Sequence, residues 1–137
     1  MYHVSPTVRI TSLSILTLAA ALLFTACKPP EPKAAASGGL AVSIVLAGSP
    51  VVGNVPVLIE VSDAGTPVSG ATVKVTGDMT HAGMQPVTAT ASETQPGSYR
   101  AESFAFTMAG DWIVTVDVST SSGSRARTEL LTTVAPK

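Results

Sequence analysis

The chain has 137 residues, of which 45% are hydrophobic and 12% are charged, and its formal net charge is −1. Without the N-terminal leader described below, seven Lys and Arg residues stand against nine Asp and Glu residues, a net charge of −2. This balance argues against a nucleic-acid partner, because nucleic-acid binding needs a clustered basic face. The remaining length suits one small domain with its own core.

The N-terminal residues 1–26 are predicted to be a lipoprotein signal peptide. Arg9 precedes an apolar stretch over residues 10–24, and small residues follow directly before Cys27. The local string Leu-Phe-Thr-Ala-Cys resembles a bacterial lipobox, which implies a diacylglyceryl group on the Cys27 sulfur and cleavage just before it. We therefore expect an extracytoplasmic lipoprotein, periplasmic or on the outer face of the cell membrane, that contacts the membrane through the lipid on Cys27.

An uncleaved anchor is the alternative interpretation of this segment. Residues 10–27 approach the roughly 18 apolar residues of a spanning helix, although the small-residue exit and the Lys-Pro-Pro that follows favour cleavage. Cys27 cannot form an internal disulfide because it is the only cysteine in the chain.

Residues 27–39 have the composition of a tether, rich in proline and alanine and ending in Ser-Gly-Gly. Residues 40–137 are expected to form the folded domain. Apolar residues there alternate with polar or small ones, the pattern of half-buried strands, and turn residues separate the runs. An immunoglobulin-like β-sandwich of about seven antiparallel strands is therefore predicted. The expected strands are 40–46, 55–61, 71–76, 87–92, 99–106 with a bulge, 112–118 and 125–134.

The candidate metal ligands are the only histidine and the only methionines that follow Cys27. If the strands alternate in direction, the predicted loop 78–86 and the turn 107–111 emerge at the same end of the sandwich. Thioethers with one imidazole are soft ligands that select Cu(I) over hard cations. The sequence therefore predicts a copper site made of Met79, His81, Met84 and Met108.

Each of these residues also has a plainer interpretation. A methionine at a strand end is often a core residue, and Met79 continues the inward phase of the strand before it, while Met108 could pack beside Phe106. A histidine on a loop, such as His81, is often simply solvated. Trp112 could cap a bound cuprous ion through a cation–π contact or serve as a core aromatic.

Three segments carry a resemblance to the YtkA-like domain family, whose relatives include the FixH group. They are Asp78-Met79 through His81, Met84 and Pro86, then Gly97-Ser98-Tyr99, then the run from Phe106 through Met108 and Gly110 to Trp112. The resemblance implies a small extracytoplasmic β-sandwich, with copper handling or the assembly of copper-containing oxidases as functions of some members.

These features predict a domain that binds copper and buffers it, or exchanges it with a donor or acceptor protein of the cell envelope. No activated nucleophile, carboxylate pair or phosphate-binding loop is evident, so an enzyme is not expected. The alternative is a metal-free interaction or scaffolding module of an envelope complex.

Overall fold

The computed structural model describes residues 39–81 and 83–137. The predicted signal peptide, the lipidation site Cys27 and the tether up to residue 38 lie outside the described residues. All regular structure in the described part of the chain is β-strand. The described residues contain no helix that is long and apolar enough to cross a membrane. The strands are β1 Leu40–Leu46, β2 Gly53–Asn54, β3 Val57–Asp63, β4 Thr66–Pro67, β5 Thr72–Met79, β6 Val87–Gln95, β7 Ser98–Ala101, β8 Ala105–Phe106, β9 Gly110–Ser119 and β10 Arg125–Val134.

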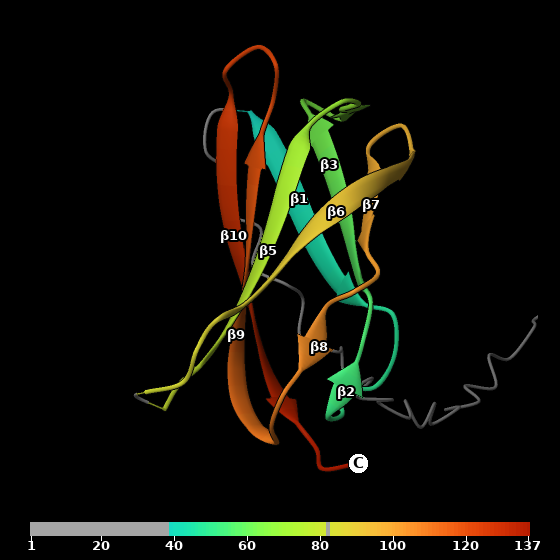
Figure 1. Ribbon diagram of the computed structural model, residues 1–137. Coiled ribbons are helices and arrows are strands. Elements are labelled where there is room, and N and C mark those ends of the chain that lie inside the picture. Colours follow the sequence, from blue (N-terminus) through green and yellow to red (C-terminus); the bar gives the residue numbers. More distant parts are fainter. Residues whose placement is uncertain (1–38, 82) are drawn as a thin grey trace, which may run out of the picture.

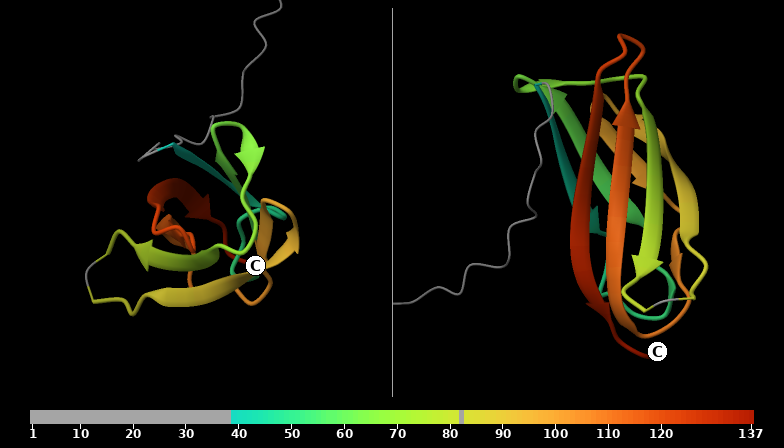
Figure 2. Two further views of the ribbon diagram at one scale, coloured as in Figure 1. Left: turned by 90° about the horizontal axis from the view of Figure 1, so that it is seen from above. Right: turned by 90° about the vertical axis from the view of Figure 1, so that its left-hand side faces the viewer.

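The seven longer strands form two layers that confirm the predicted antiparallel sandwich (Figure 1). Their order is β1-β3-β7-β6-β5-β9-β10, and every neighbouring pair is antiparallel. β6 connects the layers, because its first half pairs with β5 and its last residues pair with β7. Figure 2 shows β5, β9 and β10 in one layer and β1 and β3 in the other.

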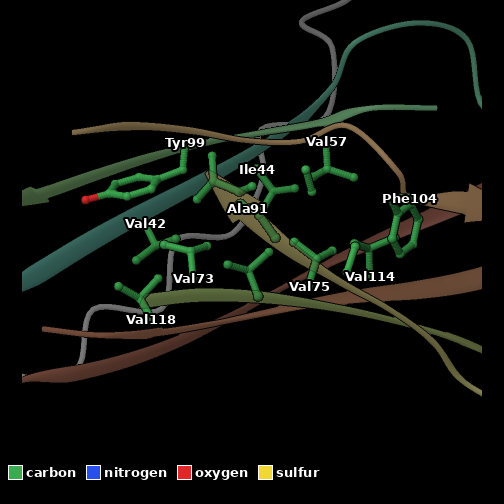
Figure 3. Packing of buried hydrophobic residues seen from close by; sticks show 14 of the residues in the cluster. Val42, Ile44, Val57, Val73, Val75, Ala91, Tyr99, Phe104, Val114 and Val118 are labelled. Carbon is green, nitrogen blue, oxygen red and sulfur yellow. The ribbon is translucent and has the colours of Figure 1, made fainter. Parts of the chain in front are cut away.

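Alternation along the strands builds the core between the layers. The inward residues of β1, β3, β5 and β9 are almost all Val, Ile or Leu and are buried, whereas their neighbours face solvent. The β-branched Val and Ile side chains among them suit a pleated, half-buried surface. Figure 3 shows the valines between Tyr99 at one end of the core and Phe104 at the other.

One position on β5 needs glycine for reasons of space. A Cβ on Gly77 would lie 2.6 Å from Cζ of Phe104 and 3.4 Å from a ring carbon of Trp112. The missing side chain therefore makes room for an aromatic cluster, in which Phe104 and Phe106 meet edge to face at 5.2 Å and Phe106 and Trp112 at 5.3 Å. This cluster lies beneath the end of the sandwich that carries the predicted ligands.

Tyr99 stabilises the end of the sandwich opposite the predicted ligands through two hydrogen bonds to the backbone. Its hydroxyl donates to the carbonyl of Val68 at 2.7 Å and accepts from the amide of Ala71 at 3.0 Å. Both partners belong to the segment that leads into β5. One buried phenol thus ties β7 to the chain between the layers.

The prediction of one continuous fifth strand is wrong. Residues 99–106 were expected to form one strand with a bulge, but the structure has β7 and β8 with a break between them. β7 pairs with β3 and β6, whereas β8 pairs with the short β2, so the chain changes partner at Phe104. The register shift lies on β6, between Glu93 and Gln95. The short strands β2, β4 and β8 were not predicted.

Candidate metal site

Pairing of β5 with β9 places the start of one candidate loop beside the turn that carries the other candidate ligand. Met79, the last residue of β5, lies opposite Trp112 on β9. One residue further, the amide of Thr80 donates to the carbonyl of Asp111 at 3.1 Å. The loop that carries His81 and Met84 therefore begins beside the turn that carries Met108. Figure 1 shows both segments at the lower end of the sandwich.

A hydrogen bond from the indole of Trp112 stabilises the turn before β9. Its Nε1–H donates to the carbonyl of Met108 at 3.0 Å, and the residue is only 1% exposed. A buried indole N–H needs such a partner. This burial favours the core role of Trp112 over a role as a cation–π cap, and it leaves the backbone of Met108 fixed at the surface.

The side chain of Met79 packs against the backbone of Gly110, at the start of β9. A Cβ on Gly110 would lie 3.0 Å from Cε of Met79, and the residue has φ +133°, a conformation that L side chains rarely adopt. The methyl end of the Met79 thioether thus lies against the backbone two residues after Met108. Met79 also packs against the core cluster, so it belongs to both the core and the candidate site.

The other three candidate ligands are exposed. The side chain of Met108 is 49% exposed and that of Met84 is 38% exposed, and His81 is exposed as well. These values exclude a core-filling role for Met108 and Met84. Two thioethers and one imidazole are therefore open to solvent at the end of the sandwich where Met79 is partly buried.

The local charge favours a cation. Segments 78–86 and 107–111 contain Asp78 and Asp111 but no Lys or Arg. The carboxylate of Asp111 accepts a hydrogen bond from the hydroxyl of Thr133 at 2.7 Å. Within the described ranges, no three His, Cys, Asp or Glu side chains form a group that could hold a metal ion; the predicted set contains one such residue, His81, and three thioethers.

A surface hollow of about 310 Å³ lies beside these loops. None of the four candidate ligands lines it, although Trp112, the predicted cap, does. Its lining residues are Thr80, Asp111, Trp112, Leu131, Thr132 and Thr133.

A family model for YtkA-like domains matches residues 34–117. The chain belongs to the YtkA-like family. The matched stretch includes all four candidate ligands and Trp112, and it ends within β9, so β10 of this YtkA-like chain lies beyond it. A comparison with curated proteins finds no match.

Three solved structures share features of the sandwich. The PmoD soluble domain from Methylocystis sp. ATCC 49242 (Rockwell) is 12% identical with a TM-score of 0.49, covering 74% of this YtkA-like chain and 97% of its own. Murine CRIg is 15% identical with a TM-score of 0.36, covering 70% and 98%. The fibronectin type-III domain of human fibronectin type III domain containing protein 3 is 15% identical with a TM-score of 0.41, covering 80% and 92%. With TM-scores below 0.5, none of the three assigns a function to this chain.

Two supporting residues of the candidate site were not predicted from the sequence. Gly110 makes room for Met79, and Thr80 extends the pairing of β5 with β9 past Met79. Neither role has a signal in the local pattern, because each depends on which strand lies next to β5.

Proposed function

We propose that this YtkA-like protein is an extracytoplasmic, lipid-anchored copper-binding domain. It binds one Cu(I) ion through Met79, His81, Met84 and Met108 and buffers the ion or passes it to a partner protein of the envelope. The observation that carries this proposal is that every methionine and histidine after Cys27 lies at one end of the sandwich, Met79 at the end of β5 and the other three in the loop that follows it and in the turn before β9.

The chemistry of these side chains supports copper in its reduced state. Thioethers are soft donors that need not lose a proton to bind, and together with imidazole they suit Cu(I) better than Mg²⁺ or Ca²⁺. The three exposed ligands would make the ion accessible. Such a site favours transfer to a partner over long-term storage.

The topology supports a site that faces away from the membrane. Leu40, at the start of β1, pairs with Asp63 at the end of β3, which is the end of the sandwich opposite Met79. A tether that runs from a lipid on Cys27 therefore enters the domain at the end remote from the loops. The exchange partner is then expected in the aqueous compartment or on a domain that projects into it. Mass spectrometry of the isolated protein for a diacylglyceryl group on Cys27 tests the anchor.

An anaerobic titration tests copper binding directly. The chain, isolated in mild detergent as the cell makes it, is titrated with Cu(I) in competition with a chromophoric chelator. We expect one equivalent bound with a dissociation constant tighter than about micromolar, equivalent to about 8 kcal/mol. Replacing His81 and Met84 together by Ala should abolish this competition.

The matched control replaces two exposed residues away from the loops, Thr72→Ala with Thr90→Ala, and should leave the affinity unchanged. Absence of competition by the unsubstituted protein, or an unchanged affinity in the His81 and Met84 variant, would disprove the copper proposal.

A second candidate function is a metal-free interaction module. Leu131 on β10 is 73% exposed and Val45 on β1 is 52% exposed, and these are the two end strands of the sheet order. Exposed apolar side chains on end strands suit contact with another protein. A protein that fails the copper titration while remaining folded would favour this function.

A further inference from the structure

The three methionines of the candidate site differ in their access to solvent. Met84 and Met108 are exposed, whereas Met79 is partly buried with its methyl group against Gly110. Thioethers are oxidised to sulfoxides by peroxides and hypohalous acids, and exposure governs which residues react first. Among the three proposed thioether ligands, the structure thus distinguishes two that are open to oxidants from one that is partly protected.

We propose that Met84 and Met108 are reversible oxidation sites that switch off metal binding. This inference rests on the proposed copper function. A hydroperoxide transfers one oxygen atom to the sulfur: the O–O bond breaks, an S–O bond forms, and the sulfur gives up two electrons while the oxidant leaves as an alcohol or water. Reduction by two thiols returns the thioether, with water and a disulfide as the products.

The consequence for the metal follows from the donor atoms. A thioether binds Cu(I) through its soft sulfur lone pair, whereas a sulfoxide offers mainly a harder oxygen. Oxidation of Met84 and Met108 would leave only His81 and the partly buried Met79. A site with two of its four ligands is expected to release Cu(I).

The fold should survive this modification. Neither Met84 nor Met108 belongs to the core cluster or packs against it, whereas Met79 does. A polar oxygen on either exposed side chain therefore enters no apolar contact of the core. The same oxidant in the same protein would act on metal binding without unfolding the sandwich.

Peptide mass spectrometry measures the order of oxidation. The metal-free chain in mild detergent is treated with a limiting amount of hydrogen peroxide, quenched with catalase and digested with trypsin. Met108 falls in the peptide 101–125, and Met79 and Met84 share the peptide 75–100, where fragment ions distinguish them. We expect Met84 and Met108 to react at least about threefold faster than Met79, the internal control.

The Cu(I) titration is then repeated on the oxidised protein. Its affinity should fall at least about tenfold and recover after treatment with a methionine sulfoxide reductase and a thiol. The double variant Met84→Leu with Met108→Leu is the matched control: it should bind Cu(I) weakly before oxidation and show no further change after it.

The outcomes separate this inference from the function on which it rests. Oxidation of Met79 as fast as the other two, or unchanged Cu(I) affinity after oxidation of Met84 and Met108, would overturn the switch alone. A failure of the untreated protein to bind Cu(I) would overturn the proposed function and the switch together.

Discussion

The two ends of the sandwich differ in how their side chains are packed and exposed. At the end where β5 begins, Tyr99 bonds to the backbone of Val68 and Ala71, and a Cβ on Gly97 would lie 2.7 Å from Pro67, so this end is closely packed. At the other end, His81, Met84 and Met108 extend from loops above a buried aromatic cluster. The first end is closed by hydrogen bonds and close contacts. The second end carries exposed thioether and imidazole side chains over the buried aromatic cluster. Substitutions at each end test this difference.

Removal of an aromatic ring from beneath the loops is expected to have the largest effect on stability. Phe104→Ala would leave a cavity beside Gly77 and Phe106, since Phe104 is fully buried. The free energy of unfolding should fall by about 3–5 kcal/mol, as measured by urea denaturation. The conservative Phe104→Leu should lose clearly less, and equal losses would show that the cluster packs loosely.

Loss of the hydroxyl at the opposite end comes next. Tyr99→Phe would leave the carbonyl of Val68 and the amide of Ala71 without their phenol partner. The free energy of unfolding should fall by about 1–3 kcal/mol, while Cu(I) affinity stays unchanged because the loops lie at the other end. A loss of copper binding in this folded variant would contradict the separation of the two ends.

Changes to the exposed thioethers should have the smallest effect on stability. Met84→Leu with Met108→Leu keeps the side-chain size and apolar character, and neither residue packs against the core. The free energy of unfolding should change by no more than about 0.5 kcal/mol, while Cu(I) affinity falls. A substantial loss of stability would show that these loops support the fold and would weaken the comparison.

Period-two alternation predicted the strands well where they are long and buried on one face. The runs 40–46 and 125–134 coincide with β1 and β10, and the run 112–118 lies within β9. The second run was placed at 55–61, whereas β3 spans Val57–Asp63. Val55 is buried but lies outside β3. Its amide donates to the carbonyl of Phe104, and the pairing of β1 with β3 ends at Val57.

The break in the strand at Phe104 could not be predicted from the local sequence pattern. Tyr99 and Ala101 have one apolar register, which slips to Phe104 and Phe106, so their spacing suggested one strand with a bulge. All four residues are indeed buried. The chain instead leaves β3 and β6 and joins β2. A buried aromatic has the same local pattern in a strand and in a well-packed crossover, and only the neighbouring segments distinguish the two.

The sequence by itself determined the alternation that makes two valine-rich layers and the concentration of methionine and histidine in two short segments, whose members other than Met79 lie in loops. Strand direction alone was enough to place those loops at one end. The tertiary structure decided which thioether is protected, since Met79 is covered through the pairing of β5 with β9 and the missing side chain of Gly110. The reason is physical: alternation depends on near neighbours in the chain, whereas the exposure of a side chain depends on the volume of residues that are distant in sequence and adjacent in space.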